Sequence, residues 1–402
     1  MKLSNLGRVV LASAISAGMA FSIIACGVSH TVDYVFVTAS KGNTSGIGEI
    51  SAYRVDSQSG ALSNVPDSPF LSGGRNPVAE VTTPDGSTLY VANELDNTIV
   101  QFKIGSDGKL YPTSTVNTPG SEPMALAVSP SGKYLFVLDS FQPHNPVYTD
   151  LNPGPGGIIV YPIGTAGALG SPVANGNQSF WPLPFSPAGA AVSPNGNTVF
   201  VVSKSGSVPG TNGVVTAYTV GSDGTLTTVG GSPFAAGTTP NAIAADPTGR
   251  FIFVTDGASN QLLSYGVTLT GSIVPNVNGP TATGGLPDAV TVDPRGAFLY
   301  VANYNDPSVM AFAINPATGE VSAVATNGTY ATQPGPNCVL VEPALGKYLY
   351  VSNFLDPTVT GLQINTTTGG IIATQGPEYK ATAQPTCVAA VPHGNHATQH
   401  VQ

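Results

Sequence analysis

Four polar residues occupy the same place in a recurring sequence motif, directly after a proline. Asn241, Asp288, Asn337 and Thr386 are 47, 49 and 49 residues apart. A constant interval of this kind brings side chains together when each repeat folds into one unit of a ring. Converging carboxylate, amide and hydroxyl groups bind a sugar, another polar small molecule or a cation. The alternative is that these residues are only the polar walls of a water-filled channel.

A second group of candidate ligand-binding residues lies in the longest repeat. The segment 141–157 carries His144, Tyr148 and Asp150, and the segment 171–187 carries Trp181, the only tryptophan of the chain. Aromatic rings beside an imidazole and a carboxylate suit a sugar or another flat ring, through stacking and hydrogen bonds. The alternative is that the aromatic side chains pack the two segments against each other.

The elements that position these residues follow from a repeated pattern. A turn with the pattern Pro-x-Gly or Pro-x-x-Gly begins at seven prolines, namely Pro84, Pro130, Pro194, Pro247, Pro294, Pro343 and Pro392. Runs rich in β-branched and aromatic residues, such as 89–93 and 349–353, follow the turns, and a strand that opens with proline precedes each of them. Four short strands in a repeat of roughly 50 residues are typical of a β-propeller blade.

The repeats predict an all-β fold with seven four-stranded blades. The first unit begins with the strand-like run 34–37 and has no inner strand of its own, whereas the run 386–391 is an inner strand without a unit. The C-terminal strand is therefore expected to complete the first blade, which removes an open sheet edge. The propeller is predicted to span residues 32–394, followed by a flexible tail at 395–402.

Composition limits the function of the chain. Only 9% of the residues are charged and the net charge is −9, with no cluster of basic residues. Nucleic acid is therefore excluded as a partner, because binding to phosphates needs clustered lysine and arginine. No phosphate-binding loop or metalloprotease motif is found, so we expect neither a cofactor nor a metal. We expect a monomer whose partner is a sugar-like small molecule or a protein.

The N-terminal segment has the pattern of an export signal. Lys2 and Arg8 precede an uncharged stretch that ends in Ile23-Ile24-Ala25-Cys26. This ending resembles a bacterial lipobox, in which the cysteine is lipidated and becomes the mature N-terminus. We expect a signal peptide at 1–25, lipidation of Cys26, a tether at 26–31 and a location in the periplasm or at the cell surface, with lipid as the only contact to the membrane. An ordinary secretory signal is the alternative.

Two kinds of run that follow the turns, Leu-Tyr-Val-Ala-Asn and Leu-Tyr-Val-Ser-Asn, resemble the YVTN repeat. The whole pattern from about residue 30 to residue 394 resembles the seven-bladed lactonase family, which includes 6-phosphogluconolactonase-like proteins. The resemblance implies the hydrolysis of a lactone at the channel mouth. Asn93-Glu94-Leu95 matches one feature of active members, whereas their Arg-His pair after the inner-strand proline is not matched in any repeat. By this resemblance Glu94 is the candidate general base, with Arg75 or His144 at the oxyanion.

Two questions stay open at the level of sequence. The chain is either a lactone hydrolase or a non-catalytic propeller that is anchored by lipid and binds a lactone or sugar-like small molecule, or a protein of the cell envelope. Cys338 and Cys387 occupy a repeat position that holds alanine or glycine elsewhere. They serve there either as small apolar side chains or as the two halves of a disulfide.

Overall fold

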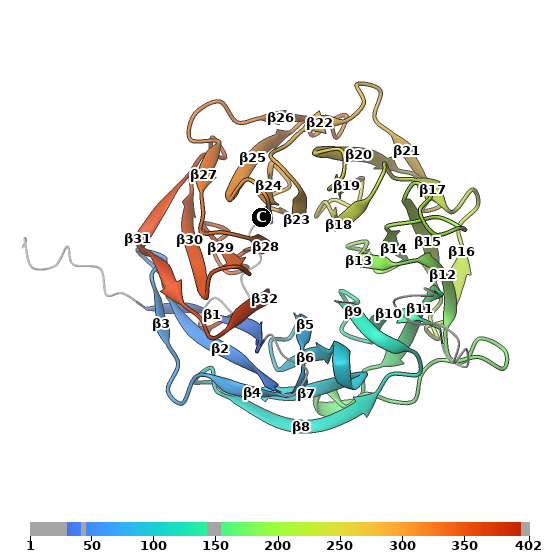
Figure 1. Ribbon diagram of the computed structural model, residues 1–402, viewed down its shortest axis with the longest axis horizontal. Coiled ribbons are helices and arrows are strands. Elements are labelled where there is room, and N and C mark those ends of the chain that lie inside the picture. The colour runs from blue at the N-terminus through green and yellow to red at the C-terminus, as the bar shows by residue number, and fades with distance from the viewer. Residues whose placement is uncertain (1–29, 42–45, 143–153, 395–402) are drawn as a thin grey trace, which may run out of the picture. The chain divides into compact units, whose positions relative to one another are not determined.

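The computed structural model describes residues 30–41, 46–142 and 154–394. Its strands form seven antiparallel sheets arranged as a ring, which confirms the predicted propeller (Figure 1). His144, Tyr148, Asp150 and Cys26 lie outside the described residues. In the part of the chain that is described, no helix is long and apolar enough to cross a membrane.

We number the blades along the chain, from the inner strand outward. Blade 1 consists of β5 (Pro77–Thr82), β6 (Thr88–Asn93), β7 (Thr98–Ile104) and β8 (Leu110–Asn117). Blade 2 consists of β9 (Ser121–Val128), β10 (Tyr134–Phe141), β11 (Pro155–Pro162) and β12 (Trp181–Phe185). Blade 3 consists of β13 (Pro187–Val192), β14 (Thr198–Ser203), β15 (Val214–Val220), β16 (Leu226–Thr228) and β17 (Phe234–Ala235).

Blade 4 consists of β18 (Pro240–Ala245), β19 (Phe251–Asp256), β20 (Gln261–Val267), β21 (Ile273–Pro275) and β22 (Thr281–Ala282). Blade 5 consists of β23 (Pro287–Val292), β24 (Phe298–Asn303), β25 (Ser308–Ile314), β26 (Val321–Ala323) and β27 (Thr329–Ala331). Blade 6 consists of β28 (Pro336–Val341), β29 (Tyr348–Asn353), β30 (Thr358–Ile364) and β31 (Ile371–Lys380). Two 3₁₀ turns, η1 (Glu94–Asp96) and η2 (Thr165–Gly167), lie between strands.

The closing blade joins both ends of the described chain. It consists of β32 (Gln384–Pro392) as the inner strand, followed by β1 (Thr31–Ser40), β2 (Ile47–Asp56), β3 (Leu62–Asn64) and β4 (Phe70–Arg75). Strands β1 and β32 pair antiparallel from Asp33↔Pro392 to Ser40↔Gln384. The last strand therefore covers the edge of the first one, as the unpaired inner strand in the sequence predicts.

The fourth strand of a blade is often split into two short pieces. In the closing blade and in blades 3, 4 and 5, two short strands pair with the same third strand. In the closing blade and blade 3 the interruption contains proline, at Pro66, Pro69 and Pro233, which has no N–H to donate to the sheet. The predicted count of four strand positions per blade is correct, and the outermost position is discontinuous.

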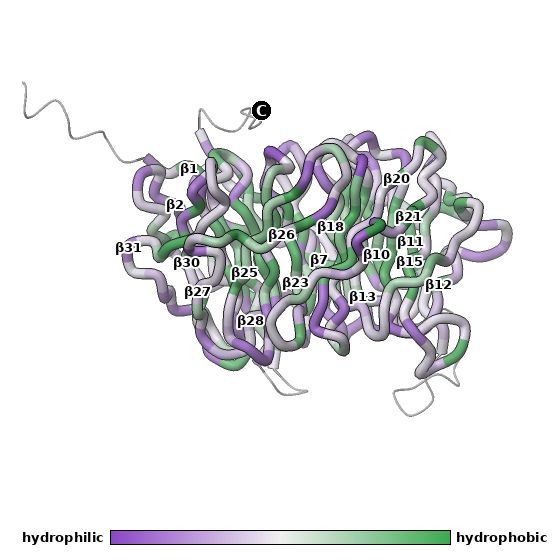
Figure 2. The backbone as a smooth tube through the Cα atoms, turned by 90° about the horizontal axis from the view of Figure 1, so that it is seen from above, coloured by the Kyte–Doolittle hydropathy of each residue, from purple (hydrophilic) through white to green (hydrophobic). Residues whose placement is uncertain are grey.

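The hydrophobic core is distributed around the ring. Buried apolar side chains of the described residues gather in seven clusters, one between each pair of neighbouring blades. Viewed edge-on, apolar segments lie mainly within the strands, and much of the hydrophilic chain lies in the loops of the two faces (Figure 2). Tyrosines of the Leu-Tyr-Val runs add polar ties between blades, since Tyr350 donates to the carbonyl of Gly60 at 2.8 Å and Tyr300 to that of Gly369 at 3.3 Å.

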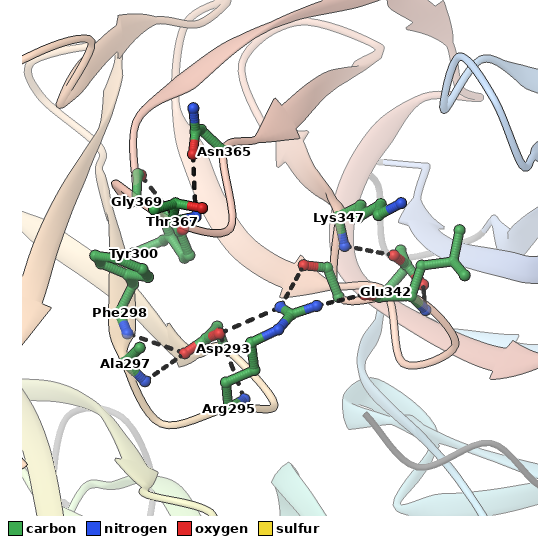
Figure 3. A network of polar contacts seen from close by, with 12 residues as sticks. Asp293, Arg295, Ala297, Phe298, Tyr300, Glu342, Lys347, Asn365, Thr367 and Gly369 are labelled. Carbon is green, nitrogen blue, oxygen red and sulfur yellow. Dashed lines mark hydrogen bonds and ion pairs between the residues drawn. The ribbon is translucent and has the colours of Figure 1, made fainter. Parts of the chain in front are cut away.

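In blades 1 to 6 the Pro-x-Gly and Pro-x-x-Gly turns connect the first and second strands on one face of the ring. Their glycines have positive φ, for example 68° at Gly86 and 74° at Gly196, which explains why glycine recurs there. The residue before the proline accepts backbone N–H groups, as Asp293 does from Ala297 at 2.8 Å and Phe298 at 2.9 Å (Figure 3). Each turn is therefore closed by its own side chain.

Arg295 links the turn of blade 5 to the turn of blade 6 (Figure 3). Its Nη1 donates to the carbonyl of Gly346 at 3.0 Å, and its Nη2 donates to that of Leu345 at 2.9 Å. Glu342, which closes the turn of blade 6, accepts the backbone N–H of Lys347 at 2.7 Å. These contacts lie on the face opposite the loops that connect the second and third strands of the blades. They therefore support the ring without occupying the end of the channel at which those loops lie.

Candidate functional site

The inner strands of the seven blades enclose a cavity of about 290 Å³ at the centre of the ring. Asn241, Asp288, Asn337 and Thr386 all line it, each half-buried, on blades 4, 5, 6 and the closing blade. The equivalent positions on blades 1, 2 and 3 are Val78, Met124 and Ala188. One side of the cavity is therefore polar and the other apolar, because each blade contributes the residue after its inner-strand proline.

Three of the four polar residues tie one blade to the next. The Nδ2 atom of Asn241 donates to the carbonyl of Pro287 at 3.3 Å, and that of Asn337 donates to the carbonyl of Thr386 at 3.0 Å. The hydroxyl of Thr386 donates to the carbonyl of Pro77 at 2.7 Å. Each side chain thus donates a hydrogen bond to the inner strand of the following blade, which gives these residues a structural role beside any ligand.

Asp288 differs from its three neighbours because an ionised carboxylate has no hydrogen to donate. Among the described residues no hydrogen bond to its side chain is found, and its carboxylate faces the cavity. Burial raises the pKa of Asp288 to about 6, although the nearby Lys204 ammonium opposes the shift. A half-buried carboxyl group with a pKa close to neutrality is suited to exchange protons with a substrate or water.

Two residues that the sequence reading missed lie near Asp288. Lys204 follows the second strand of blade 3, and Tyr304 follows the second strand of blade 5. The Lys204 charge lowers the pKa of Asp288, and burial together with the Asp288 charge raises the pKa of Tyr304. Their place directly after a second strand, at the same end of the blade as the inner-strand proline, is the signal that could have identified them.

Local backbone geometry holds Asn241 in place. A Cβ atom at Gly257 would lie 2.4 Å from Nδ2 of Asn241 and 2.9 Å from Cδ1 of Leu286. Gly257 follows the second strand of the same blade, and its N–H donates to the carbonyl of Thr239 at 3.0 Å. Glycine at this position therefore leaves the space that the Asn241 amide occupies.

Glu94 lies in the loop after β6 of blade 1 and Arg75 ends β4 of the closing blade, and neither is among the residues that line the central cavity. Glu94 begins η1 and accepts a hydrogen bond from the side-chain amide of Asn76. Arg75 contacts Asp96 through Nε at 2.6 Å and through Nη2 at 2.5 Å, and its backbone N–H donates to the same carboxylate. The arginine that sequence reasoning assigns to an oxyanion is thus engaged in holding the η1 loop.

Trp181 packs in the core instead of in a loop. It lies in β12 opposite Ile158, and only 6% of its surface is exposed. Its ring belongs to the apolar cluster between blades 2 and 3, together with Tyr218 and Leu226. This leaves little ring surface for the ligand stacking predicted from the sequence, because the residues before β12 bring the chain back onto the sheet.

Larger hollows lie at the outer surface. One of about 530 Å³ is lined by residues of blades 4 and 5, including Ser264, Asn278 and Glu320, and another of about 410 Å³ lies beside Asn365. In the first, Asn278 and Glu320 already form a hydrogen bond with each other. The central cavity is the better candidate site, because polar groups of four blades converge there around a carboxyl group whose pKa is shifted.

No metal centre is formed by the described side chains, since no group of three histidine, cysteine, aspartate or glutamate residues is arranged to bind one. The cavity wall carries the carboxyl groups of Asp288 and Glu80 and the thiols of Cys338 and Cys387. Arginine, lysine and histidine are absent from the described residues that line it. The site can therefore exchange protons and donate hydrogen bonds, but it offers no cation in its wall to hold a phosphate group.

The chain resembles known proteins in both sequence and fold. The family described as "Lactonase, 7-bladed beta-propeller" matches residues 47–144, 184–288 and 274–390. Among solved structures, a periplasmic gluconolactonase from Pseudomonas aeruginosa is 20% identical with a TM-score of 0.70, covering 90% of this chain and 99% of that chain. A protein from Bacteroides uniformis classed as a 6-phosphogluconolactonase is 18% identical with a TM-score of 0.70, covering 90% of this chain and all of its own.

No significant match is found among curated protein sequences. The two structural relatives share the fold at low sequence identity. The match of the family model covers most of the ring, from β2 in the closing blade to β32. The chain thus belongs to the lactonase family of seven-bladed β-propellers.

Proposed function

We propose that this protein hydrolyses an uncharged lactone in its central cavity, with Asp288 as the general base. The observation that carries the proposal is the Asp288 carboxylate, which faces the cavity without a hydrogen-bond partner among the described residues. Its pKa of about 6 makes it largely ionised at neutral pH and still basic enough to accept a proton from water. Family membership supports the same class of reaction.

In the proposed reaction Asp288 removes a proton from a water molecule, whose oxygen attacks the lactone carbonyl. Negative charge then develops on the carbonyl oxygen, and amide N–H groups aimed at it stabilise that charge. Asn241 and Asn337 each use one N–H of the side chain for the neighbouring blade, which leaves the second N–H for a ligand. When the ring C–O bond breaks, protonated Asp288 returns its proton to the leaving alkoxide, and the product is a hydroxy acid.

The cavity wall also favours a particular substrate class. Its volume of about 290 Å³ lies near the lower limit of roughly 300–1,000 Å³ for small-molecule pockets, which suits a single ring. A phosphorylated lactone would bring its negative charge close to the Asp288 carboxylate, and the nearby cation Lys204 is not among the described residues of the cavity wall. We therefore propose an unphosphorylated sugar lactone or a related cyclic ester as substrate.

The test is the pH dependence of lactone hydrolysis by the full chain. With the spontaneous rate subtracted, kcat/KM is expected to rise about tenfold per pH unit below pH 6 and to level off above it, because Asp288 must be ionised. The sugar lactone is expected to be a better substrate than its 6-phosphate. If no lactone of a panel of sugar and aliphatic rings is turned over at any pH, the protein is a ligand-binding propeller without this activity.

We further propose that the protein is exported and anchored by a lipid on Cys26. The lipobox-like ending of the N-terminal segment supports this, and a structural relative is named as periplasmic. In cells that express the full chain, the wild type is expected in the membrane fraction, and Cys26→Ala is expected to move to the soluble fraction. A Cys26→Ala protein that still fractionates with membranes would exclude lipid anchoring through this residue.

A further inference from the structure

A ring of small residues surrounds the channel one position beyond the polar arc. It consists of Ala79, Ala125, Gly189, Ala242, Ala289, Cys338 and Cys387, all of which line the central cavity. The two cysteines fall on neighbouring blades, blade 6 and the closing blade. Their Sγ atoms are 3.2 Å apart, although the residues are 49 positions apart in the chain. Neither thiol has a role in the proposed hydrolysis.

The geometry of the ring at this level suits a covalent bond between blades. Disulfides need Cβ atoms about 3.5–4.5 Å apart and sulfur atoms about 2.05 Å apart. The Sγ atoms of Cys338 and Cys387 are 3.2 Å apart, so they must approach by only about 1.2 Å to form the bond.

The surroundings differ between the two thiols. Cys338 accepts the backbone N–H of Val388 at 3.2 Å and lies beside Cys387. Hydrogen bonding from the Cys338 thiol lowers the pKa of Cys387, while burial opposes the shift. Cys387 is therefore the sulfur that ionises first, and the thiolate is the form that attacks a disulfide. Access is available from the cavity that both side chains line.

We propose that Cys338 and Cys387 form a redox-active dithiol that closes to a disulfide and fastens the closing strand β32 to blade 6. The oxidant is a small disulfide such as oxidised glutathione. The Cys387 thiolate attacks it, forming a mixed disulfide and releasing one glutathione. The Cys338 sulfur then attacks Sγ of Cys387, forming the Sγ–Sγ bond and releasing the second glutathione, so that two protein thiols become one disulfide.

The bond would act at the point where the ring closes. In the reduced protein β32 is held by its ladder to β1 and by packing against blades 1 and 6. A cross-link over this chain length removes conformational freedom from the unfolded chain, which raises the melting temperature by about 5 °C for a domain of this size. This inference does not depend on the proposed hydrolysis, because its readouts are thiol chemistry and stability.

The experiment treats the full chain with oxidised glutathione under native conditions, followed by alkylation and peptide mass spectrometry. We expect Cys338 and Cys387 to lose reactivity together, with their peptides joined, and dithiothreitol to restore both. We also expect the melting temperature to be about 5 °C higher in the oxidised state. The double variant Cys338→Ala and Cys387→Ala carries at both positions the alanine that four other blades have there. It should melt at the same temperature after oxidation as after reduction.

Single variants separate the two steps of the reaction. Cys338→Ala is expected to retain glutathione on Cys387, because the resolving sulfur is missing, whereas Cys387→Ala is expected to react slowly or not at all. The proposal is overturned if both thiols of the wild type stay alkylatable after oxidation, or if glutathione remains on Cys387 in the wild type. A disulfide that forms without raising the melting temperature would overturn the role at ring closure.

Discussion

Replacing Asp288 by asparagine is expected to lower kcat/KM for lactone hydrolysis by about 10²–10⁴-fold, the usual contribution of a positioned general base. The same substitution is expected to leave the fold intact or to stabilise it. An asparagine here resembles Asn241 and Asn337, which donate to the next inner strand, so it gains a hydrogen bond that an ionised aspartate cannot make. The free energy of unfolding should rise by about 1 kcal/mol.

The control for this prediction is Asp223→Asn, the same change in an exposed turn. Asp223 accepts the backbone N–H of Thr225 at 3.0 Å, and an asparagine oxygen can do the same, as Asn315 does for Ala317. This variant should keep both activity and stability. Steady-state kinetics and thermal unfolding on all variants provide the measurement.

The variant Glu94→Gln tests the alternative assignment of the general base. Glu94 is the candidate base that the family resemblance implies, and it is not among the residues of the central cavity. If Glu94→Gln loses the activity and Asp288→Asn keeps it, the reaction takes place at the loop of blade 1 and the proposal for Asp288 is wrong. If Asp288→Asn loses it and Glu94→Gln does not, the central cavity is the site.

The second large effect concerns the pH dependence of stability. Asp33, Glu80 and Asp139 are buried, and burial raises the pKa of each carboxyl group well above its usual range. The negative charge of Glu342 adds to the shift at Asp33. In the unfolded chain these groups titrate near pH 4. Between that pH and their raised pKa values the folded protein binds one more proton per group than the unfolded chain.

The free energy of unfolding is therefore expected to fall as pH rises, by about 1.4 kcal/mol per pH unit for each such group. The stabilising contribution is complete below about pH 4 and is lost as pH rises through the raised pKa values. Urea unfolding from pH 4.5 to 8.5 measures this slope. A stability that is flat or that increases over this range would contradict the prediction.

Amide variants assign the slope to individual residues. Asp33→Asn, Glu80→Gln and Asp139→Asn each remove one titrating group, so each should reduce the slope by about 1.4 kcal/mol per pH unit at pH values below the raised pKa of that group. Of the three variants, Asp139→Asn fits the fold best, because the equivalent residues of blades 1 and 5 are the asparagines Asn93 and Asn303. These two end the second strand of their blades and are fully buried.

The fold could be predicted from sequence because each blade repeats the same local signals. Proline opens an inner strand, a turn with glycine at positive φ follows, and a β-branched run forms the second strand. The repeat position also predicts which residues share a level of the ring, and this is why Asn241, Asp288, Asn337 and Thr386 were expected together. All four line one cavity. Whether they bind a ligand stays a prediction.

What the sequence does not reveal is how each side chain is engaged. The hydrogen bonds from Asn241 and Asn337 to the next blade join residues more than 40 positions apart, and they depend on the spacing between inner strands. The contact of Arg75 with Asp96 depends on the path of a short loop. Trp181 is buried because the chain returns to the sheet at β12. These features arise from packing between elements, which a repeat pattern does not encode.

The pairing of β1 with β32 has a consequence for the synthesis of the protein. Asp33 is translated 359 residues before its partner Pro392. At 5–20 residues per second, roughly 20–70 s separate the two. Blades 1 to 6 can assemble in the order in which they are made, but the hydrogen-bonding edge of β1 stays open throughout that time. The ring therefore closes only after β32 has been translated, and until then the nascent chain exposes a strand edge that can pair with other chains.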